Sequence, residues 1–174
     1  MAELVTPDDL DAYLSGDPAA ALTAAEAAVR AFCRWHVAPV RPETVKVDVS
    51  AGVAFLPSLH VVSVESVTVD GVAASGFQWL ENGVILDLRG HRDGEVEVSM
   101  THGFAADSTE GEVLRSTILA VAARAQASPS GVVRTQVGQI SETYSQTGFN
   151  QAGGVSLLDS DKAALAPFRL PARP

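Results

Sequence analysis

The chain has 174 residues, a formal net charge of −9 and an apolar share of 47%. This length suits one domain and is short for two. The negative charge argues against nucleic-acid binding, which needs clustered Lys and Arg. The single cysteine, Cys33, excludes an internal disulfide framework, and no apolar run approaches the length of about 18 residues that a membrane span requires. We therefore expect no membrane partner.

Two helices are predicted near the N-terminus. The first runs from Thr6, a good capping residue, to Gly16. The second covers residues 18–36, which are rich in good helix formers and place apolar side chains at helical spacing. Pro39 and Pro42 are expected to end this segment.

A β-module is predicted to follow. A short strand at Val45–Val49 precedes the stretch Val61–Phe104, which alternates as a sheet does. The residues predicted to share one side of its first strand are Val61, Ser63, Glu65, Val67 and Val69. Helix-like sequence lies on both sides of this block, so the pattern predicts an α+β chain with an antiparallel insertion.

Two tight turns are predicted inside the module. Asp70-Gly71 offers the positive φ angles of a two-residue type I′ turn, and Asn82-Gly83 is a second hairpin signal of the same kind. The segment Glu95–Met100 then alternates again as a strand.

The C-terminal part is predicted to begin with a helix and to become less regular. Asp107–Glu110 has the form of a capping box, and the helix after it reads to about Ala127. Residues 132–147 suit either a hairpin or an extended arm, and residues 148–154 have the composition of a linker. A short helix within Ser156–Arg169 and a loose tail complete the expectation.

Candidate catalytic and metal-ligating residues are few. None of the four histidines, at positions 36, 60, 91 and 102, pairs with another at the spacing of a zinc site, so no metal or other cofactor is expected. Cys33 and His36 lie one helical turn apart and could form a thiolate–imidazole pair; the alternative is a small core residue beside a helix-end histidine.

Charged and aromatic residues of the module leave further alternatives open. The acids near one turn could bind a cation or form a solvated strand edge; they are Asp87, Asp93, Glu95 and Glu97. The compact basic group Arg89, His91 and Arg92 suits a solvated turn or a contact with an acidic neighbour. Phe77 and Trp79 share one face and suit either core packing or a contact surface.

The order of these elements resembles the head–tail connector, or head-completion adaptor, proteins of tailed double-stranded-DNA phages. The stretches that carry the resemblance are Leu4–Leu10, Ala24–Trp35, Leu56–Gly71, Val96–Phe104, Val113–Ala127, Gly138–Tyr144 and Leu158–Arg169. The run of Leu-Pro, valine–serine alternation and Asp-Gly turn in Leu56–Gly71 is the most similar. Three residues depart from the family pattern: Gly111, Gln139 and Glu142.

The resemblance implies a structural protein of the virion, assembled in the host cytoplasm, that catalyses no reaction. The family forms a ring, commonly of twelve copies, beneath the portal, extends the DNA channel and presents a surface to a tail-proximal stopper or tail terminator protein. DNA would pass through without sequence-specific binding, which suits an acidic chain.

On this resemblance, residues 1–131 are expected to form a small helical bundle with the β-insertion at about 45–104, and residues 132–174 an extended C-terminal arm. The residues expected to contact the portal are Leu165, Phe168, Arg169 and Leu170. The hairpin tips expected to contact neighbours or the tail side are Asp70, Gly71, Asn82, Gly83, Arg89, His91 and Arg92.

Two other functions remain open from the residues. A small-ligand or carbohydrate-binding module would use Phe77, Trp79 and His91 as its platform. A hydrolase would use Cys33 and His36.

Overall fold

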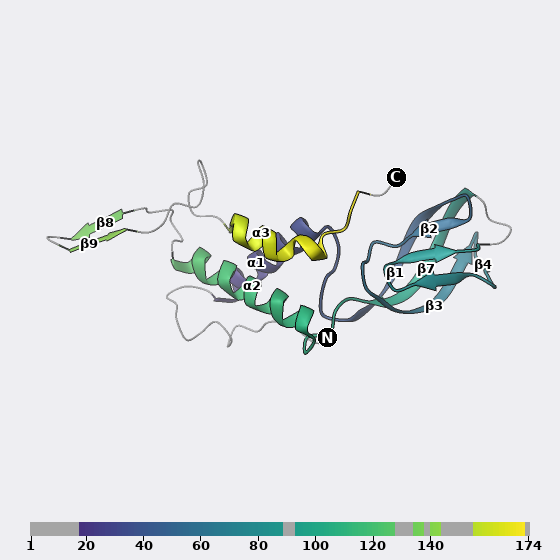
Figure 1. Ribbon diagram of the computed structural model, residues 1–174, viewed down its shortest axis with the longest axis horizontal. Helices are drawn as coiled ribbons and strands as arrows, with labels where there is room; N and C mark the ends of the chain where they lie inside the picture. Colours follow the sequence, from purple (N-terminus) through teal and green to yellow (C-terminus); the bar gives the residue numbers. More distant parts are fainter. Residues whose placement is uncertain (1–17, 89–92, 128–133, 138–139, 144–154, 173–174) are drawn as a thin grey trace. The chain divides into compact units, whose positions relative to one another are not determined.

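The computed structural model describes residues 18–88, 93–127, 134–137, 140–143 and 155–172. These ranges contain three α-helices, a seven-stranded antiparallel sheet and a separate two-stranded sheet (Figure 1). The described residues divide into a sheet unit, which holds residues 33–88, 93–111 and 168–172, and a helical unit, which holds residues 18–32, 112–127, 134–137, 140–143 and 155–167. The mixed α and β content agrees with the predicted class, whereas the helical bundle and the extended arm stay predictions. The boundary predicted near residue 131 lies outside the described residues.

The helical unit contains most of α1 (Pro18–Cys33) and α2 (Thr109–Ala127) and all of α3 (Asp159–Leu165). Buried apolar residues follow helical spacing: Leu22, Ala25, Val29 and Cys33 on α1, and Leu114, Ile118, Val121 and Ala122 on α2. α1 ends at Cys33, not near residue 36, because Arg34 adopts the left-handed conformation with φ of 70°. No helix in the described part of the chain is long and apolar enough to cross a bilayer. The helix predicted at Thr6–Gly16 lies outside the described residues.

The first turn of α2 shows a different cap from the one predicted. Ser108 Oγ accepts a hydrogen bond from Gly111 N at 3.0 Å and donates one to the carbonyl oxygen of Ala105 at 2.8 Å. A Cβ atom at Gly111 would lie 2.2 Å from that same carbonyl oxygen. The predicted box of Asp107 and Glu110 is therefore wrong by one residue, and Gly111 fills a site where a larger side chain would collide with backbone.

α3 is held by a buried carboxylate. Asp161 is 8% exposed, accepts a hydrogen bond from Leu158 N at 2.8 Å and pairs with Arg124 of α2. The paired charge and the satisfied backbone donor offset the cost of burying the carboxylate. This pair links α2 to the short C-terminal helix predicted within Ser156–Arg169, which the 3-10 turn η2 (Ala166–Phe168) extends.

The large sheet has the strand order β4-β3-β7-β1-β2-β6-β5, and all pairs are antiparallel. Its strands are β1 (Arg41–Ser50), β2 (Val53–Phe55), β3 (Val61–Val69), β4 (Val72–Ala73), β5 (Gln78–Leu80), β6 (Val84–Leu86) and β7 (Asp93–His102). The long strand β7 lies between β1 and β3, and the sheet curls (Figure 1). β1 begins at Arg41, earlier than the predicted Val45, and includes Pro42, whose missing N–H the ladder tolerates there.

The inner face of this sheet carries the apolar core. Its buried residues are Val49, Ala54, Leu56, Val61, Val67, Val69, Ile85, Leu88, Val96, Val98 and Met100. Phe77 and Trp79 pack against this core from the edge. Core packing, one of the two alternatives for this aromatic pair, is therefore what the fold shows.

Two irregularities in β3 change which side chains face the core. The register against β7 shifts between Val61 and Ser63 and again between Val64 and Ser66. Each shift inserts an unpaired residue, as a β-bulge does. As a result Val64 lies opposite the buried Met100 and packs against the core, while Glu65 is exposed. The strict alternation predicted for this strand is wrong between the two shifts.

The turns of the module agree with the prediction at one hairpin and differ at the other. Asp70 and Gly71 have φ of 50° and 78° between paired Val69 and Val72, as a type I′ turn requires. The β5–β6 hairpin instead uses a three-residue loop between Leu80 and Val84, and Gly83 alone in that loop has positive φ, 79°. The second hairpin is confirmed, and its turn type was predicted wrongly.

The segment after α2 contains a hairpin of β8 (Arg134–Val137) and β9 (Ile140–Thr143). Of the two structures predicted for residues 132–147, a hairpin and an extended arm, the described residues form the hairpin. The linker predicted at 148–154 lies outside the described residues. Part of the expected loose tail is bonded, because Leu170 N donates to the carbonyl oxygen of Cys33 at 2.8 Å.

Candidate functional site

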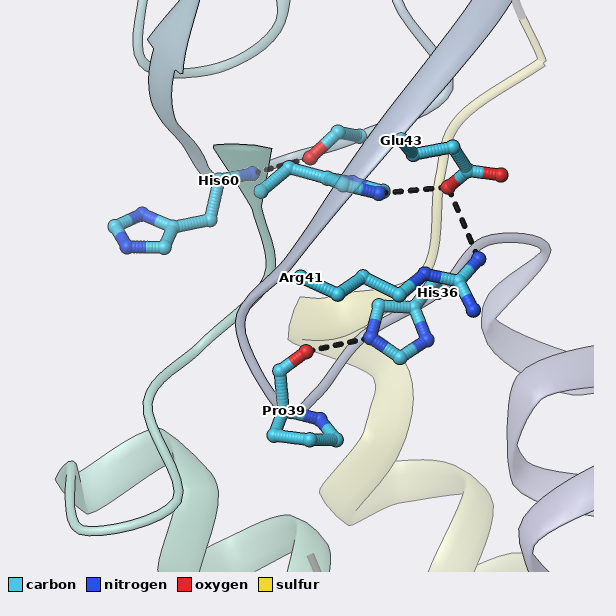
Figure 2. Close-up of polar contacts among 7 residues, drawn as sticks. His36, Pro39, Arg41, Glu43 and His60 are labelled. Atoms are coloured by element: carbon cyan, nitrogen blue, oxygen red, sulfur yellow. Dashed lines mark hydrogen bonds and ion pairs between the residues drawn. The ribbon is translucent and has the colours of Figure 1, made fainter. Parts of the chain in front are cut away.

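Three of the four histidines lie at the end of the sheet unit where β1 starts and β7 stops. His36 and His60 come from connecting segments and His102 is the last residue of β7. Figure 2 shows the polar contacts around them. The fourth histidine, His91, lies outside the described residues.

A charged network occupies the inner face at this end of the sheet. The register places Arg41 opposite His102 and Glu43 opposite Met100, so these residues continue the face that carries the core. Glu43 Oε2 lies 2.8 Å from His102 Nε2 and 3.0 Å from Arg41 Nη2. His102 is 1% exposed and Glu43 is half-buried. One carboxylate oxygen thus joins a guanidinium and an imidazole.

The protonation states follow from burial and pairing. Burial, together with the charge of Arg41, lowers the pKa of His102 more than the Glu43 carboxylate raises it. Burial alone would raise the pKa of Glu43, but hydrogen bonds from Arg41 and His102, together with electrostatic interactions with the same two residues, lower it further than burial raises it. At neutral pH, therefore, His102 is uncharged and its Nε2–H donates to an ionised Glu43. A carboxylate held in this way is a poor proton acceptor, so the network favours a structural role over general base catalysis.

Aromatic packing surrounds the network. Trp35 lies 6.1 Å from the His102 ring, measured between centroids, and also 6.1 Å from Phe104. His36 Nε2 lies 2.6 Å from the carbonyl oxygen of Pro39. These contacts fix the segment that enters the first strand.

His60 is placed by a ring stack and a contact with a carboxylate. Its imidazole lies parallel to Phe104 at 4.6 Å between centroids, and its Nδ1 lies 2.8 Å from Glu81 Oε1. Its backbone N–H donates to Ser58 Oγ, a contact drawn in Figure 2. Among the described residues, no group of three His, Cys, Asp or Glu side chains could hold a metal ion.

Cys33 is a core residue. It is fully buried, and burial raises the pKa of its thiol to about 11. The reactive species of a cysteine is the thiolate, which is scarce at neutral pH when the pKa is this high. The environment therefore favours the core role over the nucleophile that a hydrolase using Cys33 and His36 would need.

The residues expected to contact the portal divide into buried and exposed. Leu165 is 0% exposed within the helical unit and Phe168 is 8% exposed within the sheet unit. Trp35 Nε1 donates to the Phe168 carbonyl oxygen at 2.7 Å, and the Phe168 ring meets Phe104 edge to face at 5.6 Å. Arg169 is exposed and Leu170 is half-buried. Leu165 and Phe168 thus already pack inside this chain.

The hairpin residues expected to contact neighbours or the tail side also differ in exposure. Asp70, Gly71 and Asn82 are exposed, whereas Gly83 is buried. A Cβ atom at Gly83 would lie 2.3 Å from the carbonyl oxygen of Ser58. Arg89, His91 and Arg92 lie outside the described residues.

Sequence reasoning missed the network of Arg41, Glu43 and His102. The signal was present: Arg41 and Glu43 are two residues apart, and so share a face if the strand reaches them. The strand predicted from the sequence begins at Val45, so it leaves Arg41 and Glu43 outside the predicted sheet.

No family model and no curated protein sequence matches the chain. A solved structure described as the neck of an empty GTA (gene transfer agent) particle, computed with C6 symmetry, contains a chain with a similar fold. The TM-score is 0.54 at 18% sequence identity, and the match covers 92% of this chain and 84% of that one. At this identity the similarity concerns the fold.

Proposed function

We propose that this chain is a structural head–tail adaptor of a tailed double-stranded-DNA phage or phage-like particle. The observation that carries the proposal is the fold similarity, over 92% of the chain, to a chain in a particle neck. A match of this extent includes both helices and strands, so it concerns more than one common supersecondary motif.

The adaptor would form a ring beneath the portal, with twelve copies as the expected number. It would extend the DNA channel and offer a docking surface to a tail-proximal stopper or tail terminator protein. The net charge of −9 supports a channel wall to which DNA does not adhere, because like charges repel. The buried thiol of Cys33 and the paired carboxylate of Glu43 support a role that does not depend on bond-breaking.

Within this proposal, Arg169 is the residue of the C-terminal set best placed to meet the portal, because it is exposed. Asp70, Gly71 and Asn82 are exposed hairpin residues that suit contacts with neighbouring copies or the tail side. A truncation from residue 148 onward would be a poor test, since it removes the buried Leu165 and Phe168.

Electron microscopy of particles tests the proposal. We expect a ring of this chain between head and tail, and we expect particles assembled without it to lose their genome or to lack tails. Restoring the wild-type gene serves as the control and should restore both. Particles that lack the chain yet retain DNA and accept tails would contradict the proposal, as would turnover of a substrate by the purified protein.

A further inference from the structure

An uncharged row of side chains crosses the outer face of the sheet unit. The register aligns Phe55 of β2 with Val84 of β6, and Val84 with Leu80 of β5. The next row, Ala54, Ile85 and Trp79, belongs to the inner face and its core. Since successive residues of a strand point to opposite faces, the row of Phe55, Val84 and Leu80 lies outside. Phe55 is 38% exposed and Leu80 is 46% exposed.

Further apolar residues adjoin this row. Val61 N donates to the carbonyl oxygen of Glu81 at 2.7 Å, so this hydrogen bond joins the residue before Val62 to the residue after Leu80. Val62 is 49% exposed. Val53 and Leu86 lie two residues from Phe55 and Val84 on the same face. We call the set Val53, Phe55, Val62, Leu80, Val84 and Leu86 the outer apolar patch. It holds three of the five exposed large hydrophobic residues found among the described residues.

The outer face of the neighbouring strands β1 and β7 is acidic instead of apolar. Strands β1 and β7 expose the acids Asp48, Asp93, Glu95 and Glu97. Lys46 is the basic residue of these strands on that face, and it pairs with Glu95 at 3.3 Å. Two copies that each carry a net charge of −9 repel across such a surface, whereas an uncharged patch lets them approach and buries apolar area.

We propose that the outer apolar patch is the surface through which one copy of this chain binds the next copy of the ring. This inference rests on the proposed function, and the fold match to a chain in a particle neck computed with C6 symmetry supports a second copy as the occupant. In a ring the contact is head-to-tail, so the patch meets a different surface of the neighbouring copy.

Charge substitutions in the patch test the inference. Phe55→Asp and Leu80→Asp place a further negative charge at the centre of the contact, and self-association of the full chain should weaken about tenfold or more. The matched control is Val72→Asp on β4, because Val72 is apolar, 69% exposed and outside the patch. Sedimentation velocity over a concentration series measures the association, and circular dichroism checks that each variant is folded.

A thiol-protection experiment provides a readout that needs no added charge. Cys33 is the single cysteine of the chain and is fully buried, so an introduced thiol reacts selectively. Leu80→Cys should become protected from a maleimide as the ring assembles, while Val72→Cys should stay reactive.

Three outcomes would overturn the inference: rings that form equally well with Asp at position 80, equal weakening by all three Asp substitutions, or a wild-type chain that does not self-associate. In each case a ring seen on particles by electron microscopy would leave the proposed function standing. Absence of the ring from particles would instead overturn the function, even if the patch drives association in solution.

Discussion

At the scale of single residues, the imidazole of His102 is the group whose protonation matters most for stability. It is buried against Trp35 and donates to Glu43, and its Nδ1 has no hydrogen-bond partner among the described residues. A proton added at Nδ1 would place a charge in this site. Burial accordingly holds the pKa of His102 below its ordinary value.

We predict that acid weakens the sheet unit through this residue. Because the pKa of His102 is lower in the folded chain, the unfolded chain binds the proton first, and stability falls as the pH drops below about 6.5. One proton contributes a slope of at most about 1.4 kcal/mol per pH unit. Urea unfolding at a series of pH values measures this slope in the wild type and in His102→Gln.

The Gln variant serves as the reference, since its amide can still donate to Glu43 but does not titrate. Its slope just below about pH 6.5 should be smaller than that of the wild type. An equal slope in both proteins would show that other groups cause the acid sensitivity. Glu43 itself acts at lower pH, because its pKa is lowered.

At the scale of elements, the start of α2 depends on one hydroxyl. Ser108 Oγ satisfies the N–H of Gly111, and Gly111 packs against the carbonyl of Ala105. Sequence spacing favoured Asp107, because Glu110 follows it by three residues as the capping box requires, whereas Gly111 follows Ser108 at that spacing. The choice between adjacent acceptors depends on how the preceding loop turns, and the Ala105 contact determines that turn.

We predict that Ser108→Ala lowers the free energy of unfolding by about 1 kcal/mol, the usual cost of losing an N-cap. Asp107→Ala is the matched control and should change it far less, because Asp107 is exposed and Ser108 provides the cap. Urea denaturation of both variants, with an unchanged m value, measures the difference. A larger loss in the Asp107 variant would restore the cap predicted from the sequence.

In β3, too, the sequence predicts what depends on neighbouring residues and misses what depends on a distant strand. Hydrophobic alternation identified the strand and its turn at Asp70-Gly71, because both depend on neighbouring residues alone. The two register shifts depend on pairing with β7, a strand distant in sequence, and they reverse the roles expected of Val64 and Glu65.

At the scale of the whole molecule, the exposed Arg169 provides a test of the proposed portal contact. We predict that Arg169→Glu weakens docking to the portal, because it reverses the charge of an exposed side chain in the expected contact set. A pull-down of purified portal with full-length variants measures the docking.

Lys162→Glu is the control, because Lys162 is also exposed and basic in the C-terminal part and is paired with Asp159 at 3.2 Å. It makes the same change in net charge, so it separates a local contact from general electrostatics. Equal docking by the Arg169 variant and the wild type would remove this residue from the contact.

The sequence by itself determined the element types and much of their order: a helix from residue 18, a β-module with hairpins at 70–71 and 82–83, and a helix ending at Ala127. These depend on periodicity and turn chemistry, which are local. Only the tertiary structure decided that Leu165 and Phe168 are buried, that Arg41 and Glu43 join His102, and that Phe55 and Leu80 align on one outer face. Burial and strand register bring together residues far apart in the chain, and no local pattern specifies them.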